Sequence, residues 1–191
     1  SPAFFQPLTQ LEITANYNTN RSLHFIKEAK INTPFTTIHN SVVKQTMMVF
    51  LSEVLSHALK EEEENKQLFS YLETAFQWLD NHNETPNFHL VFLINLTKYL
   101  GFYPEKGDNF LYFDLIEGKF SNHILSNLYI SGINLDGFKT LLGTNFDRLN
   151  ALKLNKTNRR DLLEIVIQYF ELHLPGFKKP KSLEVLKAVF N

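Results

Sequence analysis

The chain has 191 residues, of which 43% are hydrophobic and 20% are charged, as in an ordinary globular protein. It contains no cysteine, which excludes disulfides, a thiolate nucleophile and a cysteine-ligated zinc site. The formal net charge is −1, so any affinity for nucleic acid or an anionic membrane must come from a local patch. No signal peptide or transmembrane run is evident, and we expect a cytoplasmic protein.

The first thirty or so residues alternate with period two. Leu11, Ile13 and Ala15 share one face of a predicted strand, and the polar turn of residues 18–20 leads into a second strand over residues 23–31. A two-stranded hairpin is only marginally stable in water, so it must belong to a larger sheet or pack on the rest of the chain. The chain begins without Met, as if within a strand, and we expect it to be a fragment of a longer protein.

After Pro34 the apolar spacing becomes helical, which predicts a mainly α-helical domain of about six or seven helices. The helix preceded by Thr85 and Pro86 is apolar nearly all round and should be central, with Gly101 ending it. Residues 105–120 break the pattern and predict a small internal β-hairpin or extended loop. The predicted helices begin near Ser41 and otherwise cover about 68–79, 88–100, 122–130, 135–142, 159–172 and the residues after Ser182.

No catalytic constellation stands out. The phosphate-binding, dinucleotide-binding, zinc-protease and nucleophile-elbow motifs are all absent, and the seven histidines include no pair spaced i, i+4. Asp108, Asp114 and Glu117 cluster in the irregular segment, where turn formation explains them equally well. We therefore expect a protein that is not an enzyme and needs no cofactor or metal; a hydrolase with a dispersed active site is the remaining enzymatic alternative.

Two groups of cations are candidate binding sites. On the hairpin, Arg21, Lys27 and Lys30 lie among Tyr17, His24 and Phe25, a mixture that suits single-stranded nucleic acid. A second group crowds the start of the helix predicted over residues 159–172, where it could hold phosphates or the acidic tail of a peptide. Ordinary solvated surface charge is the alternative for both groups, and also for Lys178, Lys179 and Lys181. The second group consists of Lys153, Lys156, Arg159 and Arg160.

A series of segments, in order along nearly the whole chain, resembles the RecO family of bacterial recombination mediators in its Bacteroidetes form. No single motif is diagnostic, and the series carries the resemblance. The segments are residues 5–9 (FQPLT), 23–28 (LHFIKE), 50–55 (FLSEVL), 87–92 (NFHLVF), 99–104 (YLGFYP), 113–118 (FDLIEG), 172–177 (LHLPGF) and 181–186 (KSLEVL).

The resemblance implies that residues 1–35 are the closing strands of a truncated OB-fold and that residues 36–191 are the family's helical domain. It also implies a non-enzymatic role in DNA repair and recombination: binding single- and double-stranded DNA, annealing strands, and working with RecR to replace single-strand-binding protein by RecA. The helical domain would dock the acidic, Phe-terminated tail of single-strand-binding protein in a basic-edged apolar pocket. Such a protein would act at the nucleoid.

Two departures from the family matter. Some members carry a four-cysteine zinc module after the segment matching residues 101–104, whereas residues 105–130 here contain no cysteine, so aromatic packing must hold this region. Most of the OB-fold is missing from the sequence, which bears on DNA binding by this chain. The alternative function is a helical protein-interaction domain without direct DNA binding.

Overall fold

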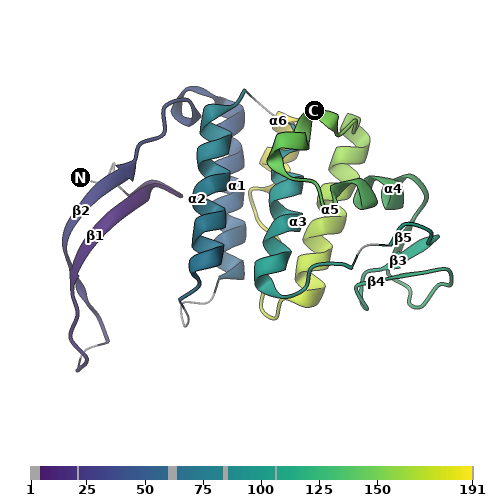
Figure 1. The fold of residues 1–191 in the computed structure, drawn as a ribbon, viewed down its shortest axis with the longest axis horizontal. Coiled ribbons are helices and arrows are strands. Elements are labelled where there is room, and N and C mark those ends of the chain that lie inside the picture. Colours follow the sequence, from purple (N-terminus) through teal and green to yellow (C-terminus); the bar gives the residue numbers. More distant parts are fainter. Residues whose placement is uncertain (1–4, 21, 60–63, 84–85, 106, 191) are drawn as a thin grey trace.

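The computed structural model describes residues 5–20, 22–59, 64–83, 86–105 and 107–190. In Figure 1 the elements follow one another across the molecule: the N-terminal hairpin, then α1 and α2, then α3, α5 and α6, and finally α4 with a small sheet. The molecule is mainly α-helical, as the sequence predicts. The helices are α1 (Val42–Ala58), α2 (Lys66–Asn81), α3 (Phe88–Leu100), α4 (Gly132–Leu141), α5 (Lys156–His173) and α6 (Leu183–Val189).

The N-terminal hairpin pairs β1 (Gln10–Asn16) with β2 (Phe25–Thr33) in antiparallel register. The pairing changes from Thr14 opposite Glu28 to Ala15 opposite Ile26, so Lys27 is an extra residue in β2 and forms a bulge. The bulge places Ile26 opposite Ala15. Ile26, and not Phe25 as simple alternation predicts, therefore shares the face of Ala29 and Ile31.

Side chains from the preceding residue fix the starts of α1 and α2. The Ser41 hydroxyl accepts the backbone N–H of Lys44 at 3.2 Å, and the Asn65 amide oxygen accepts that of Leu68 at 2.9 Å. Such caps satisfy donors that have no partner inside the helix. The predicted start of a helix near Ser41 is therefore confirmed.

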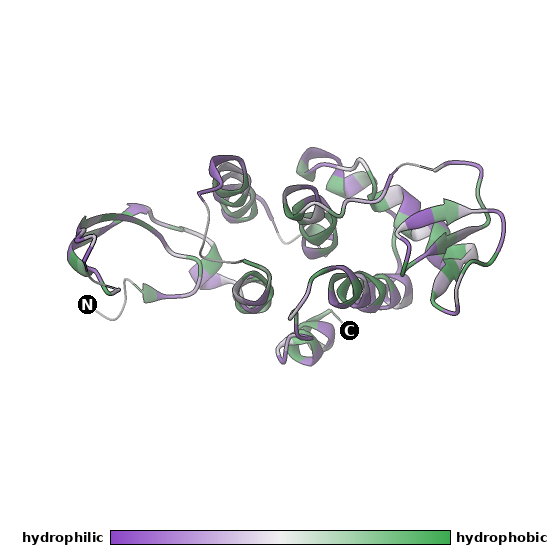
Figure 2. Ribbon diagram, turned by 90° about the horizontal axis from the view of Figure 1, so that it is seen from below, coloured by the Kyte–Doolittle hydropathy of each residue, from purple (hydrophilic) through white to green (hydrophobic). Residues whose placement is uncertain are grey.

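Helix α3 is the centre of the core. All residues from Phe88 to Thr97 are buried, and α3 contacts α2 on one side and α5 on the other. It begins at Phe88 with Asn87 in the N-cap position, later than the Thr85–Pro86 signal indicated; Thr85 lies outside the described residues. Gly101 ends it with φ +85°, as predicted. In Figure 2, which turns Figure 1 by 90°, the helices lie between the hairpin and the small sheet.

The small sheet has the strand order β4-β3-β5, where β3 is Tyr112–Asp114, β4 is Lys119–Ser121 and β5 is Tyr129–Ser131. The helix predicted over residues 122–130 is wrong. The hydroxyl oxygens of Ser121 and Ser126 accept the backbone N–H groups of His123 and Leu128, and such local bonds compete with helix formation. The segment then joins the sheet as β5.

Aromatic rings hold the sheet on the helices, as the absence of cysteine led us to expect. The Phe113 ring lies 4.8 Å from the rings of Phe120 and Phe138 and 5.8 Å from that of Tyr169. The Tyr169 hydroxyl donates to the carbonyl of Phe102 at 2.9 Å. Rings at these separations contribute packing energy beyond the area that they bury.

The segment between the hairpin and α1 is fastened to the end of α2 by Asp80. One carboxylate oxygen accepts the backbone N–H of Thr36 at 2.8 Å, and the other accepts those of Thr37 at 2.8 Å and Ile38 at 2.9 Å. The buried Lys44 ammonium lies beside this knot and donates to the Thr37 hydroxyl at 2.6 Å. Burial alone would raise the pKa of Asp80, but these hydrogen bonds outweigh it and lower the pKa to about 2.

Candidate nucleic-acid and peptide interface

The hairpin cations lie at the end of the molecule opposite the small sheet. Lys27 is exposed and, within the described part of the chain, makes no ion pair. Lys30 pairs with Glu12 at 3.1 Å, and both side chains are more than half exposed. Such a pair contributes little to stability and leaves the Lys30 ammonium accessible. Arg21 lies outside the described residues.

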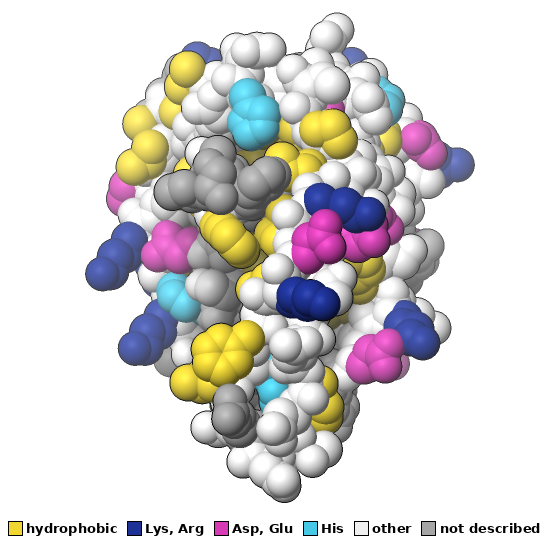
Figure 3. Space-filling model, turned by 90° about the vertical axis from the view of Figure 1, so that its left-hand side faces the viewer, with side chains coloured by type: hydrophobic (Ala, Val, Ile, Leu, Met, Phe, Trp, Pro, Cys, Tyr) yellow, Lys and Arg dark blue, Asp and Glu magenta, His cyan; other side chains and the backbone are white. Residues whose placement is uncertain are grey.

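Figure 3 looks at this end of the molecule and shows hydrophobic side chains at the surface, with His side chains and both basic and acidic side chains between them. On β1 and β2, Ile13, Ile26 and Ile31 are 47%, 52% and 38% exposed. Cross-strand pairing places Ile13 opposite Ala29, and Ile31 opposite Leu11, on one face. One face of the hairpin is therefore apolar and open.

The second basic group surrounds the start of α5. The Asn155 side chain caps the helix by accepting the backbone N–H of Asn158 at 2.8 Å. Lys153, Lys156 and Arg160 are exposed. Because the first turn of a helix presents unpaired N–H groups, cations around it add to a local positive potential that favours anions.

Arg159 differs from its neighbours because its guanidinium turns into the protein. Its Nε donates to the side-chain oxygen of Asn87 at 3.0 Å and its Nη2 to the carbonyl of Leu154 at 3.2 Å, and the group lies 6.0 Å from the Phe190 ring. Burial lowers the pKa of this guanidinium. Arg159 therefore links the start of α5 to the start of α3 and lies over Phe190, while the other three cations face solvent.

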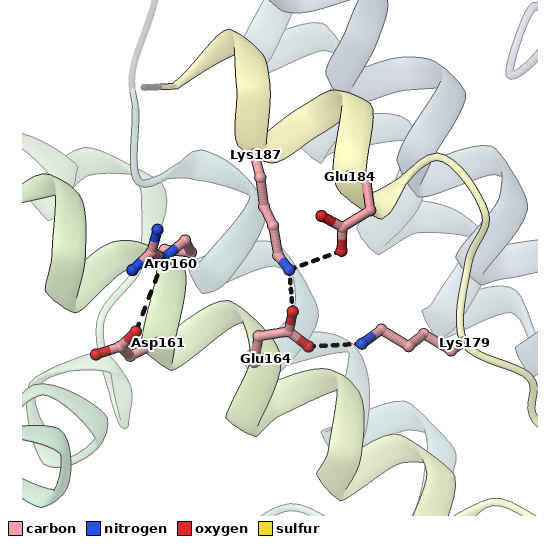
Figure 4. A network of polar contacts seen from close by, with 6 residues as sticks. All are labelled: Arg160, Asp161, Glu164, Lys179, Glu184 and Lys187. Atoms are coloured by element: carbon pink, nitrogen blue, oxygen red, sulfur yellow. Dashed lines mark hydrogen bonds and ion pairs between the residues drawn. The ribbon is translucent and has the colours of Figure 1, made fainter.

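Arg160 and Glu164 lie on the side of α5 that meets α6 (Figure 4). The Arg160 guanidinium is 3.9 Å from the Asp161 carboxylate. Glu164 binds Lys179 at 2.9 Å and also Lys187, which reaches back from α6. Burial acts to raise the pKa of Glu164, but the hydrogen bonds and charges of the two lysines prevail and lower it. Lys187 thus ties α6 to α5, and Lys179 ties the segment before α6 to the same carboxylate.

A pocket of about 450 Å³ opens between α4, the 3-10 helix Phe146–Ala151 and the start of α5. Apolar side chains of Ile133, Leu152 and Leu154 line it, and Arg148 and Lys153 supply cations. Among the described residues that line the pocket, Asp136 carries the one carboxylate, so the two cations outnumber it. Such a pocket can take an apolar side chain whose own chain carries negative charge.

Arg148 is a candidate that the sequence did not reveal. It lies in the 3-10 helix Phe146–Ala151, for which no helix was predicted, and it is in the last turn of that element. Lys153 is the one predicted cation that lines the pocket, while Lys156 and Arg160 lie outside it. The spacing of Arg148 and Lys153 gave no sign that the two would meet, because the turn between them is irregular.

Comparison with known proteins bears on the meaning of this arrangement. The family model described as "Recombination protein O C terminal" matches residues 39–107 and 123–184. The DNA repair protein RecO of Flavobacterium psychrophilum is 50% identical over 191 residues, covering 99% of this chain and 79% of the relative. This chain belongs to the RecO family.

Other RecO proteins align over nearly the same span. The DNA repair protein RecO of Christiangramia forsetii is 46% identical over 98% of this chain and 79% of the relative. That of Bacteroides fragilis is 40% identical, with the same two shares. The resemblance seen in the sequence is confirmed, including its link to the Bacteroidetes form.

The RecO family model leaves residues 1–38 and 185–191 unmatched, and also the internal segment 108–122, which contains β3 and β4. Among the described residues no group of three or more His, Cys, Asp or Glu side chains is placed to hold a metal ion. None of the described helices has the length and hydrophobicity needed to cross a membrane.

Proposed function

We propose that this RecO-family chain is a non-enzymatic mediator of DNA repair and recombination. It binds single- and double-stranded DNA and the acidic tail of single-strand-binding protein, anneals complementary strands, and with RecR helps to load RecA in the cytoplasm at the nucleoid. The observation that carries this proposal is the kinship to proteins named DNA repair protein RecO over 98–99% of the chain. No cofactor takes part.

The division of labour follows the two parts of the chain. Residues 1–35 supply two strands of an OB-fold. Their hairpin supports this assignment because it has an open apolar face, which the rest of a barrel would cover. Residues 36–191 are the helical recruitment domain. Lys27 and Lys30, with Arg21, contact the DNA backbone.

The pocket beside the start of α5 is the proposed docking site for the tail of single-strand-binding protein. Its apolar lining accepts the terminal Phe, while Arg148 and Lys153 attract the carboxylates of the tail. Lys156 and Arg160 are exposed outside the pocket and are assigned to phosphate contacts. Arg159 has its polar contacts inside the protein and is assigned a structural role.

A fluorescent peptide copying the tail tests the recruitment role by anisotropy titration. We expect saturable binding that salt weakens and that a peptide without the terminal Phe loses. Arg148→Ala and Lys153→Ala should each weaken peptide binding several-fold, whereas Lys156→Ala, the matched control on the same surface, should bind the peptide as the parent does. Equal binding of a scrambled peptide, or no effect of either pocket variant, would rule out this pocket.

Direct DNA binding separates the mediator from the alternative, a helical protein-interaction domain. Phosphate contacts release counterions, so the logarithm of the affinity for DNA should fall linearly with the logarithm of the salt concentration. Each contact removed, as in Lys27→Ala or Lys156→Ala, should make the slope shallower by about one. A chain that binds the tail peptide but no DNA would establish the alternative.

A further inference from the structure

We propose that the free end of the hairpin, where Tyr17 stacks on His24, is a platform on which an unpaired base of single-stranded DNA stacks. This site deepens the proposed function and rests on it, because it specifies how the hairpin holds DNA. Figure 1 shows the turn between β1 and β2 at the end of the hairpin that points away from the helices.

The two rings form a built pair at the surface. Their centroids lie 4.5 Å apart with the planes inclined by 30°. Tyr17 is 76% exposed although it is stacked, so one face of its ring is open to solvent. An open aromatic face is the surface on which a nucleic-acid base stacks, because every base has a flat π-face.

The turn contacts the His24 ring through one long hydrogen bond. The backbone N–H of Asn18 donates to His24 Nδ1 at 3.4 Å, so the neutral ring carries its proton on Nε2. The Asn18 side chain in turn accepts the backbone N–H of Asn20 at 2.9 Å. With Nδ1 occupied, Nε2 remains as a donor for a phosphate or a base edge.

The charge around the pair favours a nucleic acid over an acidic or purely apolar partner. Residues 13–27 contain no Asp or Glu, although they include the exposed Lys27. The carboxylates of Glu12 and Glu28 come only at the base of this stretch, and Glu12 is paired with Lys30. Within the turn itself, the phosphates flanking a stacked base would therefore meet the amide side chains of Asn18 and Asn20 and no carboxylate.

Neighbouring apolar side chains extend the surface. Leu23 and Phe25 are 79% and 66% exposed. In an OB-fold, the loop between the last two strands is one of the loops that bind oligonucleotides. The turn of this hairpin is that loop if residues 1–35 are the closing strands of such a fold.

The test uses the whole chain and three probes: an oligothymidylate, an abasic oligomer with the same number of phosphates, and an oligothymidylate carrying one 2-aminopurine, whose fluorescence falls when it stacks. We expect the parent to prefer thymidylate to the abasic oligomer and to quench 2-aminopurine. Tyr17→Ala and His24→Ala should lose about 5- to 100-fold in affinity for thymidylate, with no change in salt slope. Tyr17→Phe should keep the parent's affinity.

Thr19→Ala, in the same exposed turn, is the matched control and should behave as the parent. The platform is refuted if Tyr17→Ala binds thymidylate as tightly as the parent, or if the parent binds the abasic oligomer equally well; DNA binding through phosphates would survive either result. If the parent binds no DNA at all, the platform fails together with the DNA-binding part of the proposed function. The tail-peptide titration decides the recruitment part separately.

Discussion

Replacing Asp80 by Asn tests how the hairpin is joined to the helical domain. The carboxylate accepts three backbone N–H groups of the linker and the Thr36 hydroxyl. Asn keeps one acceptor oxygen and replaces the other by an amino group that cannot accept, so the donors on that side are left without a partner. Asp80 is 5% exposed, and water cannot readily replace the lost acceptor.

The expected cost follows from these contacts. A hydrogen bond to a charged group contributes about 1.5–3 kcal/mol, and a buried donor left unpaired costs about 1–3 kcal/mol. We expect Asp80→Asn to lower the free energy of unfolding by about 2–4 kcal/mol at neutral pH. That is a large part of the roughly 5–15 kcal/mol by which proteins are stable.

The same carboxylate predicts a pH dependence with a definite sign. The pKa of Asp80 is lowered from 3.8 to about 2 in the folded protein, so the unfolded chain binds the proton more readily. The stabilisation is therefore complete above about pH 3.8 and is lost as the pH falls toward 2, by about 2.5 kcal/mol in all. Asp80→Asn lacks this titration, so the difference between parent and variant should shrink in acid.

Urea denaturation over a pH series measures both effects. Asp161→Asn is the control, because Asp161 has an exposed carboxylate 3.9 Å from the Arg160 guanidinium and should change stability little. If Asp80→Asn loses no more stability than the control, or if its difference from the parent stays constant down to low pH, the carboxylate does not fasten the linker.

Three further predictions concern other parts of the core. Glu53 on α1 caps the start of α6 by accepting the backbone N–H groups of residues 181 and 182 at 2.7 and 2.9 Å. Glu53→Gln should therefore lower the free energy of unfolding by about 1–2 kcal/mol and reduce hydrogen-exchange protection at the start of α6. Unchanged protection there would contradict this role. Gly118 has φ +66°, and a Cβ added there would lie 2.8 Å from the Tyr169 hydroxyl. Gly101 has φ +85°, but a Cβ added there would have no neighbouring atom within 4 Å. Gly118→Ala should therefore lower the melting temperature more than Gly101→Ala, and an equal effect would contradict the close approach of Tyr169. Burial, then the charge of Arg159, lowers the pKa of His89 to about 3 from 6.5, so the unfolded state takes up the proton first as the pH falls. Between neutral pH and a pH of about 4, the free energy of unfolding of His89→Leu should therefore fall by about 3 kcal/mol less than that of the parent. Equal falls in the two proteins would contradict the burial of a neutral His89.

The sequence predicts the helices well because most of them bury one face, and α3 buries nearly all of its surface. Local signals mark several ends correctly, including Ser41 before α1 and Gly101 after α3. The sequence fails where local hydrogen bonds of small polar residues replace the helical pattern, as before β5. A three-residue strand such as Tyr129–Ser131 has too short a pattern to be recognised without its partner β3.

The candidate sites could be predicted only in part, for a different reason. Clusters of cations are visible in the sequence, but the direction of each side chain depends on packing between distant segments. Arg159 turns inward because Asn87, 72 residues away, accepts its Nε–H. Arg148 reaches the pocket from an unpredicted 3-10 helix, and Asp80 meets its partners across 42–44 residues. Such contacts have no local signature.

Recruitment of this RecO-family chain to DNA covered by single-strand-binding protein is the core of the proposed function. It can be observed by mixing the chain with single-stranded DNA saturated with single-strand-binding protein and following the complex by native gel shift. We expect a slower-migrating ternary complex, which is lost when the terminal Phe of the tail is removed and weakened by Lys153→Ala. No ternary complex, or one that forms equally well without the tail, would contradict recruitment through this pocket.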